Sequence, residues 1–327
     1  MSNIKKIGVF TSGGDSPGMN AAIRSVVRTC AYLKVECVGI YRGYEGLIEG
    51  DFKPMDARSV NNIINKGGTI LKSARCDGFR TKEGRKKAYE QLKLEGIDAF
   101  VVIGGDGSFT GAMIFNQEFE FPVIGIPGTI DNDIFGTTFT LGFDTALNTV
   151  VEAIDKIRDT ASSHNRLFFV EVMGRDVGHI ALNAGVGAGA EEILIPEENL
   201  GRERLLESLK RSKRSGKASS IVIVAEGDKT GKNIFELKDY VEENLPDYDV
   251  RVSVLGHMQR GGAPSCYDRV LASRMGVKAV EALLEGQTNL MVGILANNII
   301  LTPIEKAIKG STKINKELIR VSEIMTT

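Results

Sequence analysis

The sequence has few of the residues that build metal centres or disulfide frameworks. Its 327 residues include only four cysteines, Cys30, Cys37, Cys76 and Cys266, and no two of them form a CxxC pair. Three histidines occur, and none has a partner at the spacing of helical metal ligands. This pattern predicts reduced thiols, no disulfides and no zinc site.

The sequence also lacks an excess of charge of one sign and any long apolar run. Its 41 basic and 42 acidic side chains give a formal net charge of -1, which provides no global field for binding nucleic acid or an anionic membrane. No apolar stretch approaches the roughly 20 residues that a membrane span needs. Residues 1–10 show no secretion signal. We therefore expect a cytoplasmic protein with no nucleic-acid or membrane partner.

Glycine, in contrast, is frequent and is concentrated in loops. The chain has 37 glycines, with pairs at 13–14, 67–68, 104–105 and 261–262. Because glycine has no Cβ, it lets the backbone approach a ligand closely. The pattern predicts several places where backbone meets a bound molecule.

Short apolar, β-branched runs alternate along the chain with longer helical patterns. This alternation predicts repeated βα units, an α/β fold with parallel sheets buried on both faces. A length of 327 residues favours two such domains, with a crossover near 141–145. The expected strands cover 6–10, 36–40, 99–103, 123–126, 168–172, 192–195, 221–225, 251–255 and 291–294. The expected helices cover 19–33, 85–95, 108–116, 145–161, 202–212, 234–243 and 268–284.

The expected strand at 99–103 ends in Gly104-Gly105-Asp106-Gly107-Ser108 and then a helix. Consecutive backbone N–H groups and a helix N-terminus at the carboxyl end of a strand form a phosphate cradle. Asp106 would repel phosphates there unless it helps to hold Mg²⁺. The alternative is a tight turn in which Asp106 only caps the helix.

A second strand ends in Pro127-Gly128-Thr129-Ile130-Asp131-Asn132-Asp133, which brings two carboxylates to a strand end. In phosphoryl transfer one carboxylate can accept the proton of the attacking hydroxyl while the other orients it or the metal. We predict that Asp131 is the base; an Asx-turn is the alternative. A third glycine loop, 11–18, follows the first strand, and three such loops at one edge favour a site over independent turns.

Arginines suited to bidentate phosphate binding occur in loop-like contexts at Arg75, Arg80, Arg166, Arg175, Arg251 and Arg260. Each one alone is equally well explained as a solvated surface charge. The segment 227–233 lacks the spacing of a Walker A loop, and Thr110 stands where a dinucleotide fingerprint needs its third glycine. Ordinary P-loop and NAD-binding interpretations are therefore disfavoured.

Five motifs together resemble the bacterial ATP-dependent 6-phosphofructokinases: 11–15 (TSGGD), 104–108 (GGDGS), 127–133 (PGTIDND), 173–175 (MGR) and 256–262 (GHMQRGG). The resemblance extends from the first strand to at least Met275. It implies two similar Rossmann-like αβα domains with mostly parallel sheets. The larger, ATP-binding domain would comprise 1–142 with 257–307, and the smaller, fructose 6-phosphate-binding domain 143–256 with 308–327. The implied reaction, in glycolysis, phosphorylates the 1-hydroxyl of fructose 6-phosphate.

The resemblance also implies roles for individual residues. Those at ATP would be Gly14, Tyr44, Arg75, Cys76, Gly105, Asp106, Gly107, Ser108 and Gly111, with Asp106 also at Mg²⁺. Those at the sugar phosphate would be Thr129, Ile130, Asp131, Arg166, Met173, Gly174, Arg175, Glu226, Arg251, His257, Met258, Gln259 and Arg260. The catalytic residues would be Asp131, Arg75, Thr129, Asp133 and Arg175. Because Arg166 and Arg251 would act from a neighbouring subunit, a homotetramer with shared active sites is implied.

Two glycines favour ATP as the phosphoryl donor. Similar enzymes that use pyrophosphate carry an aspartate after the GGD and a lysine before the TIDND, where this chain has Gly107 and Gly128. An aspartate would obstruct and repel the α-phosphate region, whereas glycine leaves room for a nucleotide. ATP is therefore expected.

The family's effector pocket, for ADP or phosphoenolpyruvate, is matched only in part. The matching residues are Arg24, Arg28, Arg158, Gly189, Glu191 and Lys217. Ala57 stands where an effector arginine is often found, and Ser215, Ala218 and Ser219 stand at usually basic positions. A weak or differently tuned response to effectors is expected.

Several alternatives stay open. A pyrophosphate-dependent enzyme is opposed by the two glycines, and a lipid or NAD kinase by the PGTIDND segment. A catalytically inactive sensor would lack a base or metal carboxylate, whereas Asp106, Asp131 and Asp133 are all present. Composition leaves a close analogue such as tagatose 6-phosphate open, and only the resemblance favours fructose 6-phosphate.

Overall fold

The computed structural model describes residues 4–162, 166–198, 201–214, 220–231 and 233–325. These residues form two compact units. Unit 1 consists of Met1–Ile130, Ile134–Thr145 and Arg260–Thr312. Unit 2 consists of Asp131–Asp133, Ala146–Gln259 and Lys313–Thr327. Among the described residues, no helix has the length and apolar character to cross a membrane.

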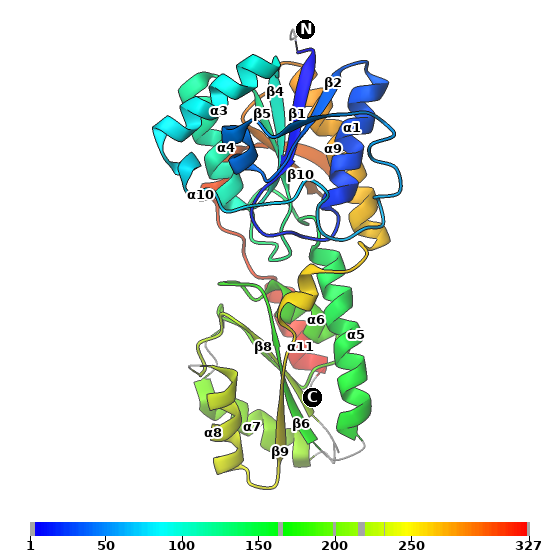
Figure 1. The fold of residues 1–327 in the computed structure, drawn as a ribbon. Helices are drawn as coiled ribbons and strands as arrows, with labels where there is room; N and C mark the ends of the chain where they lie inside the picture. Colours follow the sequence, from blue (N-terminus) through cyan, green and yellow to red (C-terminus); the bar gives the residue numbers. More distant parts are fainter. Residues whose placement is uncertain (1–3, 163–165, 199–200, 215–219, 232, 326–327) are drawn as a thin grey trace. The chain divides into compact units, whose positions relative to one another are not determined.

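Unit 1 is built on a seven-stranded sheet in the order β11-β10-β5-β4-β1-β2-β3 (Figure 1). The strands are β1 (Lys6–Thr11), β2 (Glu36–Ile40), β3 (Phe52–Met55), β4 (Ala99–Gly104), β5 (Val123–Pro127), β10 (Leu290–Leu295) and β11 (Asn298–Pro303). The five inner strands are parallel, and the two edge strands, β3 and β11, are antiparallel to their neighbours.

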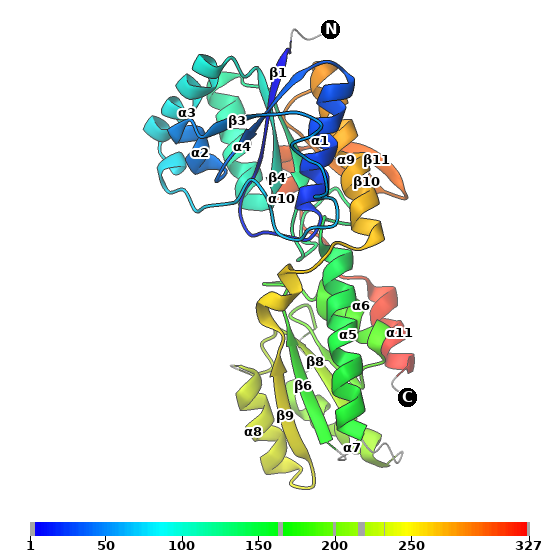
Figure 2. The ribbon, with the colours of Figure 1, turned by 45° about the vertical axis from the view of Figure 1, so that its right-hand side comes forward.

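Helices cover both faces of this sheet (Figure 2). They are α1 (Met19–Tyr32) and α9 (Cys266–Leu284) on one face, and α2 (Tyr44–Glu49), α3 (Lys82–Glu95), α4 (Asp106–Phe119) and α10 (Ile304–Lys309) on the other. Alternate residues of each strand enter opposite cores: in β4, Val101 and Ile103 pack with α1 and α9, whereas Phe100 and Val102 pack with α3 and α4. Since a strand has a side-chain period of two, an all-apolar strand supplies both cores.

Unit 2 has a parallel four-stranded sheet in the order β7-β8-β6-β9. Its strands are β6 (Arg166–Val172), β7 (Glu192–Leu194), β8 (Ser220–Ala225) and β9 (Asp249–Val254). On one side of it lie α7 (Gly201–Arg214) and α8 (Ile234–Asn244). On the other lie α5 (Phe143–Ser162), α6 (His179–Ala188) and α11 (Lys316–Met325) (Figure 2). Two short 3₁₀ segments complete the chain, η1 (Gly78–Arg80) in unit 1 and η2 (Gly256–Arg260) at the end of unit 2.

The α/β fold class is confirmed, and each expected strand corresponds to an observed one. The sequence patterns missed six elements, which are β3, β11, α2, α6, α10 and α11. The two strands are half-exposed edges, and Pro54 interrupts the pattern of β3. Helices α2 and α10 have six residues each, too short for a visible helical period, and α6 contains two glycines.

Candidate active site

The three glycine loops meet at the carboxyl edge of the unit 1 sheet. Strands β5, β4 and β1 are neighbours, so the loops that follow them are neighbours as well. The Ser12 N–H donates to the Ile103 carbonyl and the Gly128 N–H donates to the Gly104 carbonyl, each at 3.0 Å. The chain runs from β1 outward to β2 and then returns to β4 on the other side of β1. Such a reversal of strand order is where open α/β sheets bind ligands.

A side chain would be obstructed at two glycines of these loops, at Gly104 by the loops themselves and at Gly14 by the end of the Arg260 side chain. A Cβ on Gly104 would collide with the Ser12 carbonyl oxygen and the Ser108 hydroxyl, and a Cβ on Gly14 would collide with the Arg260 guanidinium. Gly107 differs, because a Cβ there would meet nothing within 4 Å. The protein itself therefore does not require glycine at 107, and the space beside it is open to a ligand.

Asp106 is the first residue of α4, and the preceding Gly105 provides no side-chain cap. The Asp106 carboxylate thus lies at the N-terminus of α4, a place that favours phosphates neutralised by a cation. In the described part of the chain, no group of three or more His, Cys, Asp or Glu side chains could hold a metal ion. Mg²⁺ commonly binds through one or two carboxylates plus substrate phosphates, so a lone Asp106 fits that ion.

Tyr44 contacts the start of α4 with both its ring and its hydroxyl. Its ring is buried and stacks on Phe79 with a centroid separation of 4.0 Å, and its hydroxyl donates to the Ser108 carbonyl. Burial raises the pKa of Tyr44 well above its usual range, so the hydroxyl remains a donor. A Cβ on Gly111 would lie only 3.0 Å from the same ring. Tyr44 and Gly111 therefore act as packing partners at the start of α4.

The remaining residues predicted to contact ATP lie in the loop between β3 and η1. Arg75 is exposed, and Cys76 is half-buried against the core that contains Tyr44 and Phe79. The cysteine is thus packed while the guanidinium is free to move toward a bound phosphate.

The carboxyl edge of the unit 2 sheet gathers most residues predicted to contact the sugar. The N–H groups of Gly174 and Arg175, after β6, donate to the Glu226 carboxylate, after β8, at 3.2 and 2.7 Å. The Met173 N–H donates to Oε1 of Gln259, in the segment after β9, at 3.2 Å. Gln259 is fully buried, whereas His257 and Met258 beside it are exposed. Three strand ends are thereby joined into one surface.

Asp131 belongs to this edge and is only 2% exposed. Its Oδ2 lies 3.7 Å from Nε of Arg175, whose side chain is 65% exposed. Arg175 has a φ of 53°, a left-handed conformation that is uncommon for a residue with a side chain. The structure thus places an arginine in that conformation next to a buried carboxylate, a pairing that the sequence did not predict.

Thr129, Ile130 and Arg260 belong to unit 1. The Thr129 carbonyl accepts the Thr140 hydroxyl at 2.6 Å, and Ile130 is fully buried. The Arg260 guanidinium donates to the Asp15 carbonyl at 3.3 Å, beside Gly14. These contacts put Arg260 within the first glycine loop.

His179, which interacts electrostatically with Asp133, was not predicted. His179, the first residue of α6, is buried, and burial lowers its pKa while the carboxylates of Glu197 and Asp133 act in the opposite direction. Both oxygens of Glu197 accept the Gly178 N–H at 3.0 Å. The sequence offered only a weak signal, a lone histidine four positions after Arg175 with no metal-ligand spacing.

Arg166 and Arg251 do not lie at this edge of the sheet. Both pair with Asp249, at 2.8 and 2.9 Å, where β6 and β9 begin. Since β6 has seven residues, Arg166 is about 20 Å from the carboxyl end of that strand. Within one chain these arginines are therefore remote from Asp131.

The residues predicted for the effector pocket divide between the units. Arg24 and Arg28 lie one turn apart on α1, and burial together with Arg28 lowers the pKa of Arg24. In unit 2, Arg158 donates to the carbonyls of Ala188 and Gly189 at 2.8 Å each and pairs with the buried Glu191 at 3.6 Å. Lys217 lies outside the described residues.

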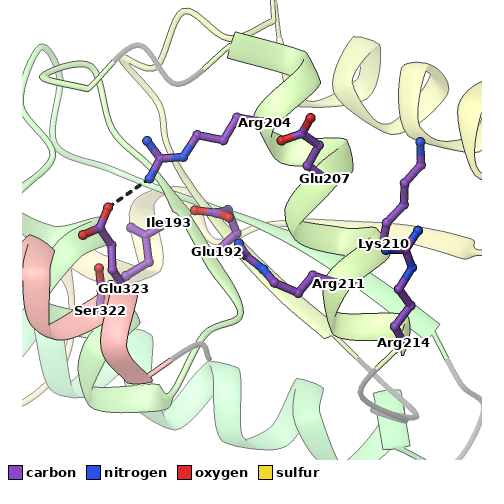
Figure 3. Close-up of a pocket in the computed structure, with 9 residues that line it drawn as sticks. All are labelled: Glu192, Ile193, Arg204, Glu207, Lys210, Arg211, Arg214, Ser322 and Glu323. Atoms are coloured by element: carbon purple, nitrogen blue, oxygen red, sulfur yellow. Dashed lines mark hydrogen bonds and ion pairs between the residues drawn. The ribbon is translucent and has the colours of Figure 1, made fainter.

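A separate groove of about 810 Å³ lies in unit 2 between α7, β7 and α11 (Figure 3). An ion pair between Arg204 and Glu323, at 3.0 Å, crosses it. No residue predicted to bind a ligand lines this groove, and its lining is Glu192, Ile193, Arg204, Glu207, Lys210, Arg211, Arg214, Ser322 and Glu323.

The sequence matches the family described as phosphofructokinase over residues 6–283. It is 54% identical to the ATP-dependent 6-phosphofructokinase 2 of Bacteroides thetaiotaomicron, over 98% of either chain. It is 53% identical to the ATP-dependent 6-phosphofructokinase 1 of Thermus thermophilus, over 98% of this chain and 99% of that protein.

Solved structures are similar as well. The phosphofructokinase of Pichia pastoris in the T-state superposes with a TM-score of 0.90 at 37% identity, covering 100% of this chain and 37% of that one. The Saccharomyces cerevisiae structure gives a TM-score of 0.88 at 39% identity, over 98% of this chain and 47% of the yeast chain. A pyrophosphate-dependent phosphofructokinase of Marinobacter aquaeolei has a TM-score of 0.84 at 22% identity, which supports the fold alone.

Proposed function

Because the chain belongs to the phosphofructokinase family, we propose that it transfers the γ-phosphoryl group of ATP to the 1-hydroxyl of fructose 6-phosphate, a step of glycolysis. The products are fructose 1,6-bisphosphate and ADP. The observation that carries the proposal is the buried Asp131 paired with Arg175 on one sheet edge, in a chain whose other sheet edge is a glycine cradle. We place the reaction in the cytoplasm.

The nucleotide binds at the carboxyl edge of the unit 1 sheet. Backbone N–H groups of Gly105–Ser108 and the N-terminus of α4 hold the phosphates, and Gly14 keeps the first loop close to them. Asp106 holds Mg²⁺, which neutralises phosphate charge when it is bound. Arg75, exposed in its loop, balances the charge that develops on the transferring group.

Asp131 acts as the general base. It accepts the proton of the 1-hydroxyl as the hydroxyl oxygen attacks the γ-phosphorus and the bond to the β-phosphate oxygen breaks. Arg175 stabilises the negative charge near this carboxylate, and Asp133 and Thr129 orient the sugar. Burial of Asp131 excludes water that would otherwise compete for its proton site.

The sugar phosphate binds to the joined strand ends of unit 2. Glu226 and Gln259 fix the backbone of Met173–Arg175, and His257, Met258 and Arg260 offer contacts to hydroxyls and to the 6-phosphate. We propose that the larger, ATP-binding domain comprises 1–142 with 257–307 and the smaller, sugar-binding domain 143–256 with 308–327.

ATP is the donor that the glycine loops favour. Gly107 leaves open space where a nucleotide's α-phosphate would extend, and a side chain at Gly128 would meet Met19 and Ile103 at 3.1 and 3.2 Å. A lysine at 128 would require the Met19 and Ile103 side chains to move slightly, so glycine is the easier fit there.

The active enzyme is a homotetramer in which Arg166 and Arg251 of one subunit complete the sugar-phosphate site of another. Their remoteness from Asp131 within one chain supports this assignment. Arg24 and Arg28, together with Arg158, Gly189, Glu191 and Lys217, form the effector pocket. ADP or phosphoenolpyruvate binds there weakly, because Ala57 and Ser215 stand at positions where the family often has basic side chains.

Product formation from fructose 6-phosphate tests the proposal. The wild type and Asp131→Ala are compared with Mg²⁺ and either ATP or pyrophosphate. Turnover with ATP that Asp131→Ala lowers by about 10²-fold or more supports both donor and base. Turnover with pyrophosphate alone would refute the donor, and no turnover with either would favour a sensor of nucleotides or sugar phosphates.

A further inference from the structure

Two helices begin close to points where the chain passes between the units. Helix α5 begins at Phe143, and the chain passes from unit 1 to unit 2 between Thr145 and Ala146. The chain returns to unit 1 at Arg260, shortly before α9 begins at Cys266. Both helix starts belong to unit 1 and lie close in sequence to these crossings.

Helix α5 cannot cap its own N-terminus. The residue before it is Gly142, with a φ of 100°, which has no side chain to accept a hydrogen bond from the first turn. A Cβ at this position would lie 2.7 Å from Cβ of Ser16 and 3.0 Å from Cδ of Pro17, so only glycine fits. Because Gly142, Phe143 and Thr145 are buried, N–H groups at the start of α5 need an acceptor from elsewhere in the chain.

Asp268, on α9, supplies that acceptor. Its Oδ1 accepts the Gly142 N–H at 2.9 Å, and its Oδ2 accepts the N–H and the hydroxyl of Thr145 at 2.9 and 2.5 Å. Gly142 is the N-cap residue of α5, and Thr145 is its third helical residue. In an ordinary capping box, two side chains of the same helix accept the N–H groups at these two positions. Here one fully buried carboxylate from a distant helix satisfies both.

The capping is reciprocal. Ser265, the N-cap of α9, accepts the Asp268 N–H at 3.2 Å and donates its hydroxyl to Asp144 of α5 at 2.5 Å. The Ser265 N–H donates to the Thr145 hydroxyl at 2.9 Å. Each helix start is therefore fixed by atoms of the other, and Asp268 contributes most of the bonds.

We propose that Asp268 is a positioning residue for phosphoryl transfer, which fixes the start of α5 where the chain leaves the ATP-binding unit. The inference rests on the proposed function, in which the ATP contacts belong to unit 1 and most sugar contacts to unit 2. Transfer depends steeply on the alignment of the reacting atoms, so a loosened connection lowers turnover more than it lowers the affinity for either substrate alone.

The test compares Asp268→Asn and Asp268→Ala with the control Asn233→Ala. Asn233 caps α8, within unit 2, and its Oδ1 likewise accepts two backbone N–H groups, at 2.9 and 3.0 Å. The Asn variant keeps the volume of Asp268 and one acceptor oxygen, so the test can still be made if the Ala variant misfolds. The dissociation constant of ATP is measured without sugar, that of fructose 6-phosphate without nucleotide, and kcat with both.

We expect kcat to fall roughly 100-fold in Asp268→Ala and less in Asp268→Asn, with both dissociation constants unchanged. Asn233→Ala should lose thermal stability and keep its kcat. An unchanged kcat in the Asp268 variants would overturn the inference, as would a kcat that falls only in proportion to weakened ATP binding. If the wild type forms no product with ATP, the proposed function itself fails, and that result is seen before any variant is compared.

Discussion

The guanidinium of Arg175 lies 3.7 Å from the carboxylate of Asp131, and the carboxylate is buried while the arginine side chain is largely exposed. The pair therefore combines a base that is shielded from water with a positive charge that can reach a ligand. Backbone hydrogen bonds from Gly174 and Arg175 to Glu226 fix the turn that carries the cation.

Replacing Arg175 with alanine should lower kcat about 100-fold, because it removes a preorganised positive charge from the reacting groups. Arg175→Lys should restore part of the loss, since a lysine keeps the charge but not the planar fork. Steady-state kinetics with ATP and fructose 6-phosphate measure both effects. Arg80→Ala is the matched control, because Arg80 is exposed and pairs only with the exposed Asp77; equal losses in the two alanine variants would contradict the role of Arg175.

Gly107→Asp should lower kcat/KM for ATP at least tenfold, about 1.4 kcal/mol, through repulsion of the phosphates. Folding should be unaffected, because nothing lies within 4 Å of a Cβ there and an acidic residue suits the first turn of a helix. Steady-state kcat/KM for ATP and the melting temperature are the measurements. Gly107→Asn has the same shape without the charge and should lose much less; an equal loss in both variants would mean that space, not charge, decides.

Asp249→Ala should raise KM for fructose 6-phosphate severalfold while leaving KM for ATP unchanged. Asp249 pairs with both Arg166 and Arg251, so its loss frees the two arginines that we assign to a neighbouring subunit's sugar phosphate. Asp247→Ala removes a nearby surface ion pair with Lys213 and should change neither constant. The same rise in both variants, or a rise in KM for ATP, would count against the assignment.

Stability should depend on pH through Asp268. Burial raises the pKa of Asp268 from 3.8 to about 6, with a smaller contribution from Asp144, while the hydrogen bonds from Thr145 and Gly142 act in the opposite direction. The folded state thus binds a proton more tightly than the unfolded chain, so this contribution is full below about pH 4 and is lost as the pH rises to about 6. Its size is about 3 kcal/mol, from roughly two pKa units.

Denaturant unfolding of the wild type and Asp268→Asn between pH 4 and pH 6 measures this contribution. The difference in free energy of unfolding between the two proteins should change across that window in the direction that penalises the wild type at higher pH. Ser322→Ala, at a hydroxyl in unit 2 remote in sequence from Asp268, should follow the wild-type profile. Parallel profiles for wild type and Asp268→Asn would show that the buried carboxylate does not titrate in this range.

The α/β class, the inner strands and the loops that carry the glycines follow from local sequence patterns. Five-residue apolar runs such as Ala99–Ile103 are typical of strands buried on both faces, and a GGDG segment after such a strand favours a close turn into a helix. The edge strands β3 and β11 and the short helices α2 and α10 had no such signal, since they owe their stability to packing on a sheet that already exists.

Only the tertiary structure decided which of the predicted residues are neighbours. Gly174, Glu226 and Gln259 come together because β6, β8 and β9 lie side by side and end at one edge, an order that the sequence does not state. Arg166 is separated from Asp131 because it begins β6, whose other end leads to Met173–Arg175, and Arg251 pairs with the same Asp249 that begins β9. The capping of α5 by Asp268 joins residues more than a hundred positions apart, and chain folding alone creates such a contact.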